Sequence, residues 1–219
     1  MTPLDDVGFV RFGTGLEPAV LQSLRGTLFA AGEAGTRCLL DHPAVRSTAI
    51  RLREELTAAG LLPAGARAVQ AIAFDKTPGT NWKVTWHQDL LFPFAEAMTG
   101  GGFALPCLKD GIHYARPPLE VLEALTAVRL HLDDCDETNG PLRIAPGSHK
   151  NGILESGEIR DHLAKCGEIT CPAKEGEVLL MKVLALHASS QATLPGHRRV
   201  LHLVYYSGAP MAAPWHRAI

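Results

Sequence analysis

The sequence of 219 residues is short of several features by which protein classes are commonly identified. It has five cysteines, an odd number, and no two of them form a Cys-x-x-Cys pair. Neither a disulfide framework nor a zinc knuckle is therefore indicated. Reduced and mostly buried thiols are the simpler interpretation, and they favour a reducing compartment.

An excess of positive charge is also missing, as is any long apolar run. Lysine and arginine number 21 against 23 acidic residues, a net charge of -2, which argues against a general nucleic-acid-binding role. No apolar run approaches the roughly 18 residues that span a bilayer, and the acidic start of the chain lacks the pattern of a signal peptide. We expect a soluble, cytoplasmic protein that binds small molecules and neither nucleic acid nor membrane; no feature indicates an oligomeric state.

The first part of the chain predicts two helices. One begins near Pro18 and the other near Pro43, and in each the apolar residues recur at helical spacing. Gly60 is well placed to end the second helix. No repeat, linker or low-complexity tract divides the chain, so we expect a single domain over residues 1–219, with a helical N-terminal part over about residues 1–62.

From residue 67 the pattern changes to short segments rich in β-branched and aromatic residues, separated by turns. The strands expected from this pattern are 68–74, 82–89, 127–132, 142–144, 177–183 and 198–206. Short strands, long loops and helices gathered at the front predict a mainly-β sandwich or small barrel with added helices. Residues 150–172 read as a polar excursion between strands.

Residues 91–118 are interrupted by prolines and by a run of three glycines. A connection this long inside a compact domain is usually functional or mobile. We expect a lid or substrate loop here, with an irregular surface segment as the alternative. His113 within it is a candidate substrate contact.

The stretch around His87 carries the clearest chemistry. His87 and Asp89 stand two residues apart on an expected strand, so their side chains point to the same face and can be ligands of one metal ion. His187, at the end of another strand, would complete a set of two imidazoles and one carboxylate, which leaves coordination positions open. Arg198, on the following strand, can hold a carboxylate in a bidentate pair.

Strand alternation extends this face to further residues. If the strand is regular, Asn81, Lys83 and Thr85 share the face of His87 and line the same pocket, although Lys83 could equally be a solvated charge. On that basis the two tryptophans of the strand, Trp82 and Trp86, pack on the opposite face.

The turn over residues 133–140 holds several acidic side chains, which could suggest calcium, but their spacing is not that of an EF-hand and a solvated turn is the better interpretation. Asn139 in this turn is a structural residue or a co-substrate contact. His131, His149 and His202 could be mistaken for metal ligands, but no spacing requires them.

Taken together, these motifs resemble the phytanoyl-CoA dioxygenase family. The resemblance rests on His87-Gln88-Asp89, the turn Thr138–His149, His187, and Gly196-His197-Arg198, in that order, and it covers about residues 67–207. Family members are Fe(II)- and 2-oxoglutarate-dependent oxygenases. The resemblance implies a double-stranded β-helix (jelly-roll, cupin-like) core with the N-terminal helices packed on it.

Carried over position by position, the resemblance makes His87, Asp89 and His187 the iron ligands. It makes Arg198 the residue that binds the distal carboxylate of 2-oxoglutarate, with the hydroxyl of Ser189 as its partner. Thr85 and Asn139 are the remaining candidates for contact with this co-substrate. Arg199 is the alternative to Arg198, but alternation along the strand would turn it away from the pocket.

The implied reaction consumes O2 and 2-oxoglutarate, releases succinate and CO2, and hydroxylates an aliphatic carbon. Related halogenases have a small residue in place of Asp89, so this chain is expected to be a hydroxylase. Members of the family act on acyl-CoA thioesters, amino-acid-like solutes and secondary metabolites. Because we find no basic patch suited to the phosphates of CoA, we expect a small free metabolite as the substrate.

Two other functions use the same ligands. A zinc-dependent hydrolase also needs three protein ligands and an open position, but Arg198 and Ser189 would be superfluous beside a zinc-bound hydroxide. A non-catalytic jelly-roll binding protein is the other alternative. The intact triad argues against it, because such a cluster of polar groups in a pocket is costly without a metal.

Overall fold

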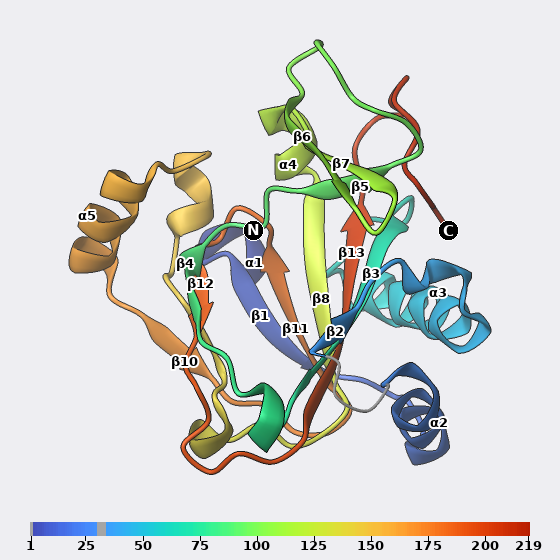
Figure 1. Cartoon of the computed structure of the whole chain (residues 1–219), viewed down its shortest axis with the longest axis vertical. Helices are drawn as coiled ribbons and strands as arrows, with labels where there is room; N and C mark the ends of the chain where they lie inside the picture. The colour runs from blue at the N-terminus through green and yellow to red at the C-terminus, as the bar shows by residue number, and fades with distance from the viewer. Residues whose placement is uncertain (1, 30–33) are drawn as a thin grey trace.

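The computed structural model describes residues 2–29 and 34–219, and the strands there form three antiparallel sheets (Figure 1). The six-stranded sheet has the order β1-β11-β8-β13-β3-β2, with β1 Phe9–Gly13, β11 Glu177–Lys182, β8 Leu125–His131, β13 Arg198–Tyr206, β3 Arg67–Lys76 and β2 Gly35–Thr36. The four-stranded sheet has the order β10-β9-β12-β4, with β10 Ile169–Cys171, β9 Leu142–Ile144, β12 His187–Ser189 and β4 Val84–His87. The three-stranded sheet has the order β5-β7-β6, with β5 Phe92–Phe94, β7 Ile112–Arg116 and β6 Ala104–Lys109.

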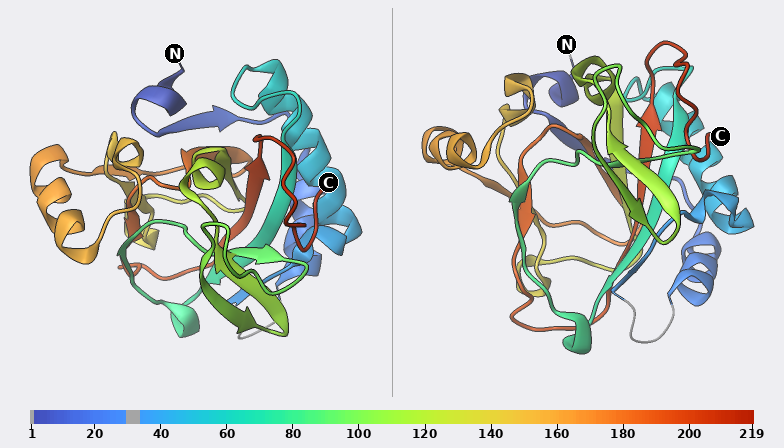
Figure 2. Two further views of the ribbon diagram at one scale, coloured as in Figure 1. Left: turned by 90° about the horizontal axis from the view of Figure 1, so that it is seen from above. Right: turned by 45° about the horizontal axis from the view of Figure 1, so that its top comes forward.

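The six-stranded and four-stranded sheets face each other across the centre of the molecule (Figure 2). Along the chain, β3, β8, β11 and β13 belong to the larger sheet, and β4, β9 and β12, which fall between them, belong to the smaller one. This alternation between two facing antiparallel sheets is the double-stranded β-helix, or jelly roll. The predicted mainly-β fold class is confirmed.

Two helices cover the outer face of the six-stranded sheet (Figure 2). They are α2, Pro18–Leu28, and α3, Pro43–Ala58, and each begins with a proline, as the sequence predicts. Their apolar stripes meet one face of β13, where Leu201, Leu203 and Tyr205 are buried, while the residues between these face the interior of the sandwich. None of the described helices is long and apolar enough to cross a membrane.

The first 62 residues contribute strands as well as helices, which the sequence does not predict. β1 pairs with β11 and β2 with β3, so both ends of the larger sheet come from this part of the chain. Because that sheet unites N-terminal and C-terminal strands, we infer one domain. The shorter helical segments are α1 Pro3–Asp6, η1 Leu39–Asp41, η2 Pro78–Thr80, α4 Leu119–Glu123, η3 Glu137–Asn139, η4 Ser148–Asn151 and α5 Ser156–Cys166.

Two segments are more regular than expected. Residues 91–118 hold the whole three-stranded sheet, and Phe92 and Phe94 of β5 are buried in the core, so this segment is not an irregular loop. Residues 150–172 contain α5 and β10. The helix α5 carries Ile159 and Leu163 at helical spacing and they are partly buried, but none of its side chains is fully buried.

The hydroxyl of Tyr205 joins the larger sheet to the helical layer. It donates a 2.7 Å hydrogen bond to the backbone carbonyl of Ala49 in α3, and Tyr205 is 1% exposed. We expect Tyr205→Phe to lower the free energy of unfolding by about 1 kcal/mol, the net contribution of a buried hydrogen bond, and to lower Tm by about 2–4 °C. Thermal and denaturant unfolding measure both quantities.

Tyr206→Phe is the matched control. Its hydroxyl bonds the carbonyl of Ala209 in the C-terminal segment and holds no helix to the sheet. A loss of stability equal to or greater than that of Tyr205→Phe would contradict the role given to Tyr205.

Candidate metal centre and its pocket

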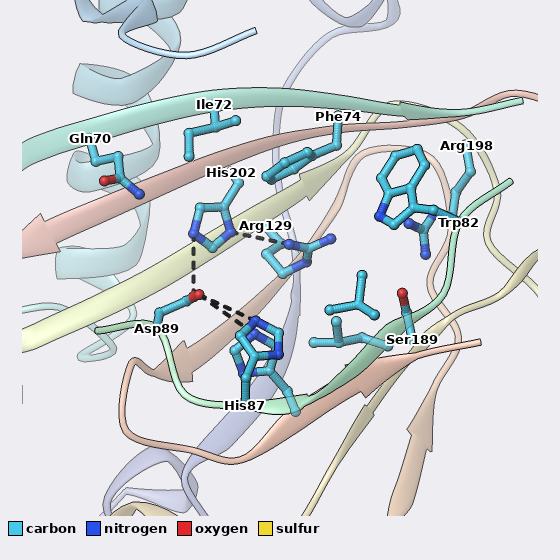
Figure 3. Close-up of a pocket in the computed structure, with 13 residues that line it drawn as sticks. Gln70, Ile72, Phe74, Trp82, His87, Asp89, Arg129, Ser189, Arg198 and His202 are labelled. Atoms are coloured by element: carbon cyan, nitrogen blue, oxygen red, sulfur yellow. Dashed lines mark hydrogen bonds and ion pairs between the residues drawn. The ribbon is translucent and has the colours of Figure 1, made fainter. Parts of the chain in front are cut away.

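A cavity of about 240 Å³ lies between the two facing sheets and contains most of the candidate residues (Figure 3). Side chains of both sheets line it. Its apolar walls are formed by Ile72, Phe74, Trp82, Val84 and Leu142. The pocket therefore has one polar interior between apolar walls, as small-molecule sites generally do.

His87, Asp89 and His187 form a cluster at this pocket. One ligand atom from each residue lies within 4.8 Å of the other two. The Nε2 atoms of His87 and His187 each lie 3.7 Å from Oδ1 of Asp89. The pairing of β4 with β12 explains the geometry, because His87 and His187 are direct partners across the ladder. Asp89 follows the end of β4, and its backbone N–H donates to the carbonyl of Val183 at 3.0 Å.

Both imidazoles are oriented by the backbone. Nδ1 of His87 lies 2.9 Å from the carbonyl oxygen of Thr85, and Nδ1 of His187 lies 2.9 Å from that of Ala185. A carbonyl only accepts, so each Nδ1 carries the proton and each Nε2 presents its lone pair toward Asp89. Hydrogen bonds of this kind set the tautomer of metal-bound histidines.

The protonation states suit a cation. Burial lowers the pKa of His187 to about 4, so this imidazole is neutral at pH 7. Burial opposes ionisation of Asp89, but the surrounding histidines, His187 first, together with the guanidinium of Arg129 hold the pKa of that carboxyl below its usual value. Metal binding needs neutral imidazoles and an ionised carboxylate.

The residues present fit a divalent transition metal. Nε2 of His87, Nε2 of His187 and Oδ1 of Asp89 face one another, with 3.7 Å between each nitrogen and the oxygen, a spacing that one shared ion would bridge. Two nitrogens and one oxygen on one side of an ion are the donor set of non-haem Fe(II) oxygenases. Within the described ranges, no other group of three or more histidine, cysteine or acidic side chains is placed to hold a metal ion.

His202 joins this cluster, although no spacing in the sequence points to it. Its Nε2 lies 3.7 Å from Oδ2 of Asp89, and its Nδ1 lies 3.2 Å from Nη1 of Arg129. A guanidinium only donates, so Nδ1 of His202 accepts and Nε2 carries the proton that faces Asp89. Oδ1 of Asp89 therefore faces the two ligand imidazoles, and Oδ2 faces His202.

Arg198 and Ser189 line the same pocket, as expected, and are 4% and 2% exposed. Arg198 donates from Nη1 to the carbonyl of Gly140, while its Nε is buried without a partner. Arg199 points away and pairs with both carboxylate oxygens of Asp133 at 2.7 and 2.8 Å. Arg198 thus faces the pocket and Arg199 faces away from it, as alternation along the strand predicts.

Lys76 is a residue that the sequence reasoning missed. It is 1% exposed and is the direct cross-strand partner of Arg198. Its Nζ donates to the carbonyl of Ser190 at 2.6 Å and lies 3.4 Å from Oγ of Ser189. Burial, and then the charge of Arg198, lower the pKa of Lys76 to about 8. Like charges directly opposite each other destabilise a sheet. Lys76 is not itself part of the pocket lining, but its contact with Ser189 places its charge beside the end of the pocket that Arg198 and Ser189 form, which is suited to an anion.

Asn81, Lys83 and Thr85 do not line the pocket, and the expectation that they share the face of His87 is wrong. The cause is a β-bulge in β4. Opposite β12, His187 pairs with His87 but Ser189 pairs with Val84, so β4 holds one residue more than its partner. The bulge reverses the alternation, and Trp82 and Val84 face the pocket instead.

The displaced candidates have other places. Lys83 and Thr85 are exposed, whereas the side chain of Asn81 bonds both backbone groups of Ala192 at 2.7 and 2.9 Å. Asn139 donates to the carbonyl of Asp134 at 3.0 Å and stands outside the pocket lining. His113 of β7 also lies outside the pocket lining. It is the cross-strand partner of Phe94 in β5.

We expect His202→Ala to weaken the binding of Mn(II) or Fe(II) by about 10- to 100-fold, the usual effect of removing a group that orients a metal ligand. Titration of the apo protein, followed by calorimetry or by the EPR signal of free Mn(II), measures this change.

His131→Ala is the matched control, since it removes a buried imidazole of β8 that is not part of the pocket lining. Its metal affinity should equal that of the unmodified protein. Equal losses in the two variants would mean that His202 acts through general packing.

The model of one protein family, described as phytanoyl-CoA dioxygenase (PhyH), matches residues 5–200. No curated protein matches the chain. Among solved structures, AviO1 from Streptomyces viridochromogenes Tue57 is 19% identical, with a TM-score of 0.66 over 97% of this chain and 95% of that one.

Two further structures are similar. HygX from Streptomyces hygroscopicus, with nickel and 2-oxoglutarate bound, is 16% identical, with a TM-score of 0.62 over 93% of this chain and 83% of that one. SnoK, a non-heme alpha ketoglutarate dependent carbocyclase from nogalamycin biosynthesis, is 17% identical, with a TM-score of 0.66 over 94% and 81%. These likenesses establish a shared fold.

Proposed function

Because the chain belongs to the phytanoyl-CoA dioxygenase family, we propose that it is an Fe(II)- and 2-oxoglutarate-dependent dioxygenase that hydroxylates an aliphatic carbon of a small metabolite. The products would be succinate, CO2 and the alcohol. One observation carries the proposal: the cluster His87, Asp89 and His187 shares a single pocket with the buried guanidinium of Arg198 and the hydroxyl of Ser189.

The triad residues would hold Fe(II), and 2-oxoglutarate would be the co-substrate, as the bound state of HygX and the description of SnoK suggest. Iron bound there would activate O2, with 2-oxoglutarate as the source of the additional electrons, for oxidation of a carbon–hydrogen bond of the substrate. The chain itself holds the two imidazoles by their Nδ1 atoms, so that their Nε2 atoms are aimed at one point.

The cationic end of the pocket would bind the distal carboxylate of 2-oxoglutarate. Arg198 offers a planar fork of donors, Ser189 a hydroxyl and Lys76 a second positive charge. Held there, the co-substrate would reach toward the triad in one orientation. The apolar walls, including Phe74 and Trp82, would exclude water from the reacting groups.

Asp89 supports hydroxylation over halogenation, because its carboxylate fills the position that related halogenases leave to halide. Its Oδ1 lies at 3.7 Å from both ligand imidazoles. The cavity of about 240 Å³ is below the roughly 300–1,000 Å³ of pockets for drug-sized ligands. A small metabolite suits that volume. Hydrolysis by a zinc-bound hydroxide would not require the cationic end of the pocket, so this feature favours the oxygenase over a zinc hydrolase.

Anaerobic addition of Fe(II) and 2-oxoglutarate should give a visible charge-transfer absorption band. We expect the band to disappear in His87→Ala, which loses a ligand, and in Arg198→Ala, which loses the main cation for the distal carboxylate. Absorption spectroscopy, with succinate release as a second measure, tests this.

Arg199→Ala is the control, because Arg199 lies on the opposite face of the same strand and pairs with Asp133. It should retain the band. Absence of the band in the unmodified protein, together with tight stoichiometric binding of zinc, would overturn the oxygenase proposal.

Lys76 gives the co-substrate affinity a pH dependence. Its protonated form attracts a carboxylate, and its pKa is lowered to about 8, so affinity for 2-oxoglutarate should fall as pH rises through about 8. We expect Lys76→Gln to weaken binding at pH 7 by roughly tenfold and to abolish this dependence. Calorimetry between pH 6.5 and pH 9.5 measures it; an unchanged pH profile in the variant would contradict the role of Lys76.

A further inference from the structure

Arg129 of β8 is a buried cation for which neither the triad nor the expected co-substrate clamp accounts. It is 7% exposed and lines the pocket. Its contacts are with neutral groups: Nη1 lies 3.2 Å from Nδ1 of His202, and the guanidinium lies 5.9 Å from the centre of the Phe74 ring. Its Nε is buried and has no hydrogen-bond partner in the described part of the chain.

A guanidinium in this setting needs an anion. Burying a charge without a counter-ion is costly, and burial, followed by the charge of Arg198, lowers the pKa of Arg129 to about 10. The one carboxylate in the pocket lining belongs to Asp89, whose two oxygens face the ligand imidazoles and His202. The charge of Asp89 offsets part of the cost of burying Arg129, but among the described residues no carboxylate forms a hydrogen bond or a close ion pair with this guanidinium.

Charge balance in the pocket leads to the same conclusion. Two buried cationic side chains, Arg129 and Arg198, line the pocket and Lys76 is buried beside it, against the single carboxylate of Asp89, which a metal ion would neutralise. A carboxylate bound between Lys76 and Arg198 would satisfy that end. It would leave Arg129 without a counter-ion.

The guanidinium is also fixed in place. His202 accepts one of its N–H groups, and Phe74 lies beside it. Figure 3 shows it between His202 and Arg198, projecting into the pocket. A planar fork held in this way is suited to bidentate recognition of a carboxylate.

We propose that Arg129 binds a second carboxylate beside the metal centre, separate from the one held at Arg198. The inference rests on the proposed function. Two molecules can supply this group: 2-oxoglutarate, through the carboxylate next to its oxo group, or the primary substrate, which would then be a small carboxylic acid. The chemistry is the same, and binding measurements distinguish the sources.

The first measurement compares 2-oxoglutarate with 4-oxobutanoate, which keeps the distal carboxylate and lacks the one beside the carbonyl carbon. Both are titrated calorimetrically into the Ni(II)-loaded protein and into its Arg129→Gln variant. If the co-substrate supplies the carboxylate, the variant binds 2-oxoglutarate roughly tenfold to a hundredfold more weakly and binds 4-oxobutanoate unchanged.

The second measurement addresses the primary substrate. Ni(II)-loaded protein saturated with N-oxalylglycine, an unreactive analogue of 2-oxoglutarate, is titrated with butanoate and with its neutral counterpart butanamide. If the substrate supplies the carboxylate, the unmodified protein prefers butanoate by tenfold or more, and Arg129→Gln loses that preference while its affinity for 2-oxoglutarate is unchanged.

Arg129→Lys keeps the charge without the fork, and it provides the test if the glutamine variant does not fold. The lysine variant should still distinguish 2-oxoglutarate from 4-oxobutanoate, or butanoate from butanamide, but should bind the compound with the additional carboxylate more weakly than the unmodified protein does. Arg46→Gln, on α3 and away from the pocket lining, is the control and should change neither measurement.

A variant that leaves both comparisons unchanged would overturn the proposal. So would one that lowers only metal affinity, since Arg129 would then merely position His202. If the unmodified protein prefers butanoate in an Arg129-dependent way but binds no 2-oxoglutarate, the carboxylate site stands and the oxygenase proposal fails.

Discussion

The antiparallel pairing of β4 with β12 is the constraint on which the rest of the site depends. It sets His87 directly opposite His187, and the chain leaving β4 then brings Asp89 to the same point. Each imidazole is held by a backbone carbonyl two residues earlier in the chain, that of Thr85 within β4 and that of Ala185 just before β12, so the local backbone also orients the ligands. His187 is buried by the surrounding structure, whereas His87 is partly exposed, so the site is open to solvent on the side of β4.

Electrostatics divides the pocket into two regions. On one side the carboxylate of Asp89 lies among three imidazoles, an arrangement suited to a cation. On the other, Lys76 and Arg198 face each other across neighbouring strands with a serine hydroxyl beside them, an arrangement suited to an anion. Arg129, held by His202, lies where the two regions meet. Like charges are buried together here, which reduces the stability of the empty protein and favours the state with a bound anion.

Much of this could be predicted from short-range patterns, and the failures have physical causes. The triad, Arg198 and Ser189 followed from motifs in order along the chain, and the front helices followed from apolar periodicity. The helix α5 has Ile159 and Leu163 at helical spacing, but polar residues surround this short stripe, so the segment reads as a polar connection although its periodicity could have indicated a helix. Lys76, Arg129 and His202 come together only through strand pairing between β3, β8 and β13, and a single sequence does not specify which strands pair. Alternation along β3 and β13 could have placed Lys76 and His202 on the inner face.

The bulge in β4 has a practical meaning for protein engineering. By inserting one unpaired residue just before the ligand His87, it changes which neighbours form the substrate wall, so mutagenesis guided by simple alternation would target the solvent-facing Lys83 and Thr85. A library intended to change what the pocket accepts would instead vary Trp82 and Val84. Removing a residue to make the strand regular would be expected to rotate the preceding segment and to replace an aromatic wall with polar side chains.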